Sequence, residues 1–234
     1  MSRSLTVFCS VLVLASMLYA QNAPEAPAGY RAELQKGTSF TGFQWTPGVD
    51  NFNGKLAAII PTYSGEGGLG QMSLYGIKYG YFISTGWAVG GVLDFGSQSS
   101  KRDLPGGDQA KTSSTQFGIT AFGKYFLQPK FKDVTVWLGA GISFGSYSST
   151  DETTGTNPDK TEYSATSIGI AADFGAQYFF AEGFSLSADY MLGFLNFSEP
   201  EVTTTNGNVS TTVKGPSATF FGTMTGSLGI NFYF

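Results

Sequence analysis

Five charged residues are the chain's candidates for chemistry, because each interrupts the polar side of a segment that alternates apolar and polar residues. They are Lys78, Asp94, Lys124, Asp173 and Asp189. If the polar side lines the interior of a narrow barrel, these groups could form a proton path or a substrate site, or pair with one another. We favour pairing, because an interior of eight strands is just wide enough for side chains to fill it.

An enzymatic role for these carboxylates has little support in the rest of the chain. The 234 residues include no His and one Cys, and acyl or peptidyl transfer commonly uses His as a base near neutral pH. Asp173 and Asp189 lie on adjacent predicted strands without an evident substrate path, so we expect no enzyme and no cofactor. Asp151, Glu152 and Asp159 lack the spacing of a calcium loop, so we expect no metal site.

The first twenty residues have the shape of a secretory signal peptide. Arg3 precedes an apolar run from Leu5 to Leu18, and Ala20 comes directly before polar residues. The run, about 14 residues, is short for a membrane-spanning helix. We therefore predict a signal peptide over 1–20, which removes the single Cys, and a flexible N-terminal segment over 21–36.

Composition points to an all-β chain that does not bind nucleic acid. Charged residues make up 13% of the chain and the net charge is −4, which is unlike the basic surface of a nucleic-acid-binding protein. Gly (32), Phe (21) and Tyr (12) are abundant, and no helical periodicity follows the first twenty residues. This combination is typical of many strands joined by turns.

The clearest strand is the last stretch of the chain, 218–234. Every second residue back from Phe234 is apolar or Gly as far as Ala218, whereas the other parity is mostly polar or small. Side chains on a strand alternate between its faces, so this strand has one apolar face. At about 3.3 Å per residue it is long enough to cross a bilayer.

Similar alternation predicts seven further strands, at 37–46, 71–83, 87–97, 113–127, 134–148, 163–180 and 184–197. Short turns at 84–86, 129–133 and 181–183 alternate with long connections, of which 99–111, 149–161 and 199–215 read as polar loops. Bacterial outer-membrane barrels have this asymmetry. We predict an all-β, eight-stranded antiparallel up-and-down transmembrane β-barrel over 37–234. Its apolar parity faces lipid and its hydrophilic parity fills the interior, where Gly139, Gly141 and Gly145 leave room for bulk such as Phe122 or Trp137.

Strands that run towards a short turn end in a similar aromatic group. Tyr81, Tyr125 and Tyr178 belong to the first three of these groups, and Phe232 and Phe234 to the last. Amphipathic rings prefer the level of lipid headgroups, so we predict an aromatic girdle, the alternative being ordinary cross-strand packing.

On these residues the chain resembles the small outer-membrane β-barrel proteins of Gram-negative bacteria, of the kind common in Bacteroidetes. The signal peptide, the Tyr-Phe strand ends and the terminal Gly-Ile-Asn-Phe-Tyr-Phe carry the resemblance. It implies a location in the bacterial outer membrane. It also implies that the barrel-assembly machinery reads Phe232 and Phe234 as an assembly signal.

The expected function is a structural or surface-interaction role, in envelope integrity, adhesion or defence through the outer loops. A narrow pore for small solutes is the alternative, and a soluble lipid-binding barrel or a membrane enzyme are further ones. The expected partners are outer-membrane lipid, the assembly machinery and an unidentified extracellular molecule. We expect a monomer.

Overall fold

The computed structural model describes residues 34–46, 74–104, 107–127, 133–155, 158–207, 209–215, 218–220 and 223–234. The predicted signal peptide, most of the segment 21–36 and the connections 47–73 and 128–132 lie outside the described residues. The part of the chain that is described contains no helix long and apolar enough to cross a membrane.

The described residues form ten strands that pair antiparallel with one another. Their bounds are β1 (Ser39–Thr46), β2 (Leu74–Ser84), β3 (Trp87–Asp103), β4 (Gln109–Leu127), β5 (Val134–Thr154), β6 (Asp159–Ala181), β7 (Phe184–Asn206), β8 (Val209–Lys214), β9 (Ala218–Phe220) and β10 (Thr223–Tyr233).

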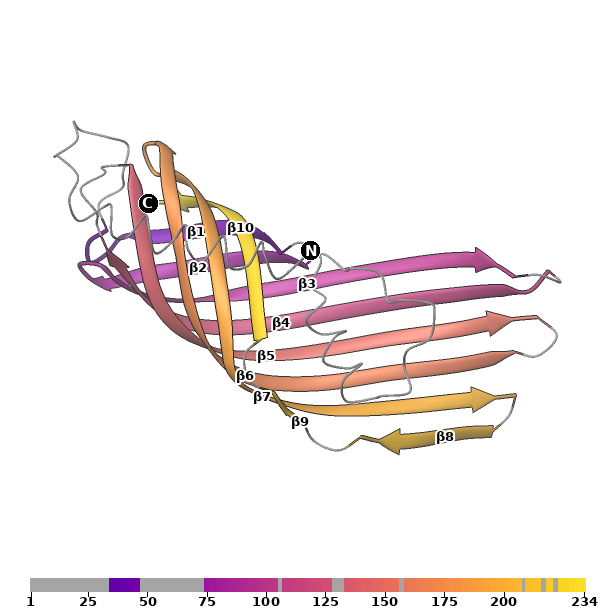
Figure 1. Ribbon diagram of the computed structural model, residues 1–234. Coiled ribbons are helices and arrows are strands. Elements are labelled where there is room, and N and C mark those ends of the chain that lie inside the picture. The colour runs from indigo at the N-terminus through magenta and orange to yellow at the C-terminus, as the bar shows by residue number, and fades with distance from the viewer. Residues whose placement is uncertain are drawn as a thin grey trace.

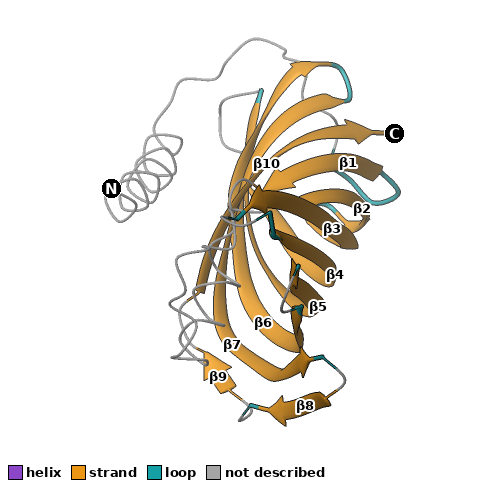
Figure 2. Ribbon diagram, turned by 90° about the vertical axis from the view of Figure 1, so that its right-hand side faces the viewer, coloured by secondary structure: helices purple, strands orange, loops and turns teal. Residues whose placement is uncertain are grey.

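Eight of these strands close into a ring, shown from two sides in Figures 1 and 2. β1 to β7 follow one another around the sheet, and β10 pairs with both β7 and β1. β10 pairs with the first part of β7, and β9 and β8 pair with the parts of β7 that follow it. β8 and β9 therefore lie on the same side of β7 as β10. The predicted eight-stranded antiparallel barrel is confirmed.

The two faces of each barrel strand carry the side chains that the alternation predicts. Ile142 is 58% exposed on the outer face, and Leu228 and Ile230 are also exposed there. Inward positions such as Lys78 and Phe122 are buried. The apolar parity therefore faces out, which excludes the soluble lipid-binding barrel, whose apolar parity would face in.

Two places depart from this alternation. The pairing of β7 with β6 skips Phe194, which is the extra residue of a β-bulge. A bulge shifts the parity by one position, so that both Phe194 and Phe197 face out. Val136 has the outward parity but is buried, and nothing in the described residues explains this.

The three predicted polar loops are wrong, because they are paired strands. β3 continues to Asp103, β5 to Thr154 and β7 to Asn206, and each partner strand starts a few residues later. Ser and Thr lack the apolar alternation that marks a strand at a lipid boundary, yet β-branched Thr favours strands. Their hydroxyls also meet across the strands, as between Thr203 and Thr212 at 2.9 Å.

The long strands extend beyond the ring as an open sheet, hereafter the extension, which comprises the parts of β3–β8 beyond the ends of β1, β2 and β10 (Figure 1). The pairing of β2 with β3 ends at Phe95, eight residues before β3 itself ends. At about 3.3 Å per residue, the extension is roughly 26 Å long on β3.

We predicted hydrophilic side chains throughout the interior of the ring. At the end that carries the short turns, the interior is instead apolar. An aromatic plug lies there, formed by Phe40, Phe82, Phe122, Phe126, Trp137 and Phe179. The rings of Phe82 and Phe126 lie 5.1 Å apart, and those of Phe126 and Trp137 5.6 Å apart. Eight strands leave too little room for water beside such bulk, so the plug closes this end.

Glycines leave space for the plug, mostly at positions that the sequence analysis did not propose. A Cβ on Gly175 would collide with the indole of Trp137, and one on Gly90 with the ring of Phe122. A Cβ on Gly139 would instead meet Lys124, at 2.9 Å from its Cγ. Of the proposed positions, Gly141 lies near Phe122, where a Cβ would be 3.7 Å from the Cβ of Phe122.

Candidate functional site

Four of the five inward charged residues meet in one buried ion cluster inside the ring. Lys124 Nζ lies 2.6 Å from Asp173 Oδ2 and 3.1 Å from Asp189 Oδ1. Lys78 Nζ lies 3.3 Å from Asp189 Oδ2. These four side chains come from β2, β4, β6 and β7, so the cluster links four of the eight strands of the barrel.

The remaining bonds of the two carboxylates are also satisfied within the ring. Trp137 Nε1 donates to Asp173 Oδ1 at 3.2 Å, and the Ser187 hydroxyl donates to Asp189 Oδ2 at 3.3 Å. Lys124 Nζ lies 4.9 Å from the centre of the Trp137 ring, close enough for a cation–π contact. Two cations and two anions cancel, so the cluster fills the lumen without a net charge.

Asp94 lies outside this cluster. Its Oδ1 accepts a hydrogen bond from Gln44 Nε2 at 2.9 Å, and it forms no ion pair with a described Lys or Arg. The structure therefore brings together four of the five predicted lumen charges and leaves the fifth with a neutral partner.

The sequence analysis did not predict the hydrogen bonds that several inward residues form with these charges or with one another in the lumen. Gln44, Trp137 and Ser187 support the charges, and Asn231 Nδ2 donates to Ser185 Oγ at 3.2 Å near the short turns. All lie at inward positions, and this parity was the one feature of the sequence that could have identified them. Their partners depend on the register between strands, which the alternation does not give.

The predicted girdle residues Tyr81, Tyr125 and Tyr178 lie exposed on the outer face near the short turns. Trp87 packs on Tyr125, with ring centres 5.0 Å apart, and adds an indole to this level. That these rings sit among lipid headgroups stays a prediction.

The proposed assembly signal lies at the closure of the ring. Phe234 is 72% exposed, and its backbone N–H donates to the Ser39 carbonyl at 2.9 Å. Phe232 packs edge-on against Phe184, with ring centres 5.2 Å apart. Recognition of these two residues by the assembly machinery stays a prediction.

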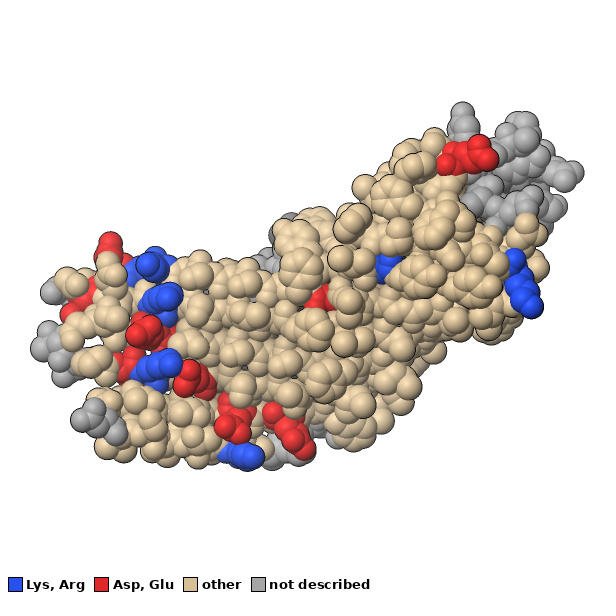
Figure 3. All heavy atoms as spheres, turned by 180° about the vertical axis from the view of Figure 1, so that it is seen from behind, with Lys and Arg blue, Asp and Glu red and all other residues tan. Residues whose placement is uncertain are grey.

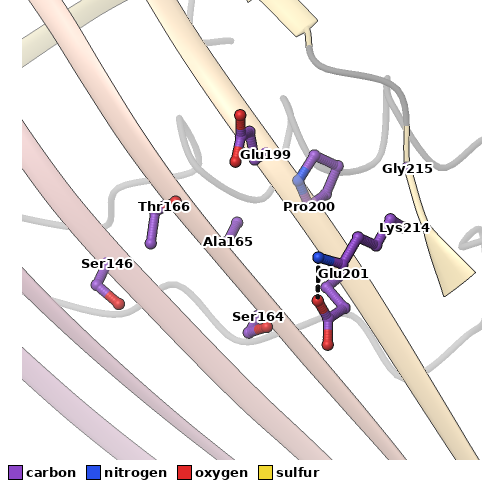
Figure 4. Close-up of a pocket in the computed structure, with 9 residues that line it drawn as sticks. All are labelled: Ser146, Ser164, Ala165, Thr166, Glu199, Pro200, Glu201, Lys214 and Gly215. Carbon is purple, nitrogen blue, oxygen red and sulfur yellow. Dashed lines mark ion pairs between the residues drawn. The ribbon is translucent and has the colours of Figure 1, made fainter. Parts of the chain in front are cut away.

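A second candidate site is a hollow of about 370 Å³ on the extension (Figure 4). Its lining comes from β5, β6, β7, β8 and the residue after β8: Ser146, Ser164, Ala165, Thr166, Glu199, Pro200, Glu201, Lys214 and Gly215. Carboxylate, ammonium and hydroxyl groups all reach it, so it can bind a polar ligand.

A closed antiparallel ring with an apolar outer face and a filled interior defines a transmembrane β-barrel. The family model of the outer membrane protein beta-barrel domain matches residues 9–215. The chain belongs to this family and is a protein of the bacterial outer membrane.

The solved structures to which this chain is similar share little sequence identity with it. The N-terminal beta-barrel domain of Pseudomonas aeruginosa OprF is 14% identical, with 86% of this chain and 98% of that chain covered and a TM-score of 0.37. Ail, the attachment invasion locus protein of Yersinia pestis, is 13% identical, with 85% and 99% covered and a TM-score of 0.44. A major outer membrane protein from Thermus thermophilus is 10% identical, with 84% and 99% covered and a TM-score of 0.48. Among curated proteins, no match was found.

We predict that replacing Lys124 in the ion cluster lowers the free energy of unfolding more than replacing Lys160 on the extension does. Lys124→Met leaves Asp173 without an ion pair and Asp189 with one fewer, so we expect a loss of about 3–5 kcal/mol in the free energy of unfolding. The control is Lys160→Met on the extension, where Lys160 pairs with Glu162 in solvent, and we expect little change there. Denaturant unfolding in lipid vesicles measures both. Equal stability of the two variants would contradict a structural role for the cluster.

Proposed function

We propose that this protein is a closed membrane anchor that holds the extension outside the cell for interaction with surface molecules, in adhesion or defence. The observation that carries the proposal is the continuous strand pairing of the extension, from Gly96 to Asp103 on β3 and from Ser198 to Asn206 on β7. Paired strands keep a fixed shape, whereas loops of the same length would not.

The outer face of the extension supports this role by its chemistry. Charged side chains gather on it, and few appear over the barrel (Figure 3). One cross-strand row runs from Lys101 through Lys111 and Glu152 to Lys160. Mixed charges on a fixed sheet offer a partner specific pairing positions as well as general solubility.

A narrow pore is the alternative, and the filled lumen argues against it. A solute would have to pass the ion cluster, whose side chains are at most 11% exposed, and then the aromatic plug. The proposal includes no catalytic role, because the chain has no His and both Asp173 and Asp189 are ion-paired in this lumen.

Conductance in planar bilayers separates the anchor from the pore. We expect the purified full chain to insert without stable current steps, because side chains fill the ring. Stable channels that disappear on substitution of Lys78 or Asp173 would favour the pore instead.

The extension is testable by shortening it at partnered positions. Ser97 pairs with Thr115, Ser148 with Ser164 and Glu201 with Lys214, so an Asn-Gly turn can join each pair directly. We expect the shortened barrel to keep its heat-dependent migration in SDS gels while cells that display it lose attachment to surfaces or resistance to serum. Unchanged attachment and resistance in cells with the shortened barrel would contradict the proposal.

A further inference from the structure

The hollow on the extension begins where the apolar outer face ends. Phe144, Ile168 and Phe197 are direct cross-strand partners, each about half exposed, and form the last apolar row over β5–β7. The next row on the same face lies two positions along each strand, away from the short turns. In it, Ser146 pairs with Thr166 and Thr166 with Glu199. The polar lining of the hollow therefore starts directly above a lipid-facing row.

The lining supplies both donors and acceptors in a space of suitable size for a small ligand. Hydroxyls come from Ser146, Ser164 and Thr166, and carboxylates from Glu199 and Glu201. A volume of about 370 Å³ falls at the small end of ligand-binding pockets, which span roughly 300–1,000 Å³. Adjacent sugar hydroxyls both donate and accept, so a carboxylate beside a hydroxyl side chain can bind them in pairs.

The net charge of the side chains that line the hollow favours some lipid headgroups over others. Lys214 Nζ lies 3.8 Å from Glu201 Oε2, so this carboxylate offsets the charge of the single ammonium in the lining. Among the described residues, Glu199 forms no ion pair, which leaves one negative charge in excess. A phosphate would be repelled, whereas an uncharged sugar would not.

We propose that this hollow binds the uncharged sugar headgroup of a glycolipid in the outer leaflet. The sugar hydroxyls bind Thr166 and Glu199, and the acyl chains run down over Phe144, Ile168 and Phe197. This inference rests on the outer-membrane location of the barrel and does not depend on the proposed role of the extension.

The test compares two Glu–Thr pairs that lie across β6 and β7 on the same outer face. Thr166 faces Glu199 in the hollow, and Glu162 faces Thr203 farther out. The full chain is placed in lipid nanodiscs, and binding of a monoglucosyl diacylglycerol is measured by native mass spectrometry. The hollow variant is Glu199→Gln with Thr166→Val, and the matched control is Glu162→Gln with Thr203→Val.

We expect binding to weaken about tenfold or more in the hollow variant, because hydrogen bonds to a carboxylate are lost, and to stay unchanged in the control. The wild-type chain should bind the glucosyl lipid more tightly than a phosphatidylglycerol with the same acyl chains. It should also bind more tightly than methyl glucoside, which lacks the chains. Glu199→Gln alone provides a milder variant, and heat-dependent migration verifies that each one folds.

Three results would overturn the proposal. They are equal glycolipid binding by the wild-type chain and the hollow variant, an equal loss in the control, and a preference for phosphatidylglycerol. Binding of methyl glucoside as tight as that of the glycolipid would overturn the assignment to lipid.

Discussion

The pairing of β1 with β10 is the interaction on which the rest of the structure depends. Hydrocarbon offers no water to an unpaired backbone N–H or C=O, and each one left exposed costs several kcal/mol. Six register pairs from Phe40–Tyr233 to Trp45–Leu228 satisfy the two strands that would otherwise be edges. The reciprocal backbone bonds between Ser39 and Phe234 secure the end of this seam.

Closure in turn dictates what fills the interior. Inward side chains from eight strands converge on a narrow axis, so each polar group there needs a partner within the ring. The ion cluster meets this need for Lys78, Lys124, Asp173 and Asp189, and the aromatic plug fills the end with the short turns. A barrel packed in this way is suited to the membrane anchoring that we propose.

The sequence was most informative where lipid restricts it most. An apolar outer face leaves a strict alternation, which is why the positions of Leu228 and Ile230 could be predicted from residue type alone. The outer face of the extension carries polar residues in place of that alternation, so its paired strands resembled loops. The hydrogen bond between Gln44 and Asp94, and the hollow beside Glu199, depend on strand register and on residues far apart in the chain.

Nitroxide accessibility tests the orientation of the two faces most directly. The single Cys of the sequence is Cys9, so a Cys introduced at Ile230 or at Asn231 can be spin-labelled after the predicted cleavage. In lipid vesicles we predict that the label at residue 230 collides with oxygen, which concentrates in hydrocarbon, and not with a water-soluble nickel chelate. The label at residue 231 should be shielded from both. A label at residue 230 that meets the nickel chelate more often than oxygen would contradict a lipid-facing outer surface.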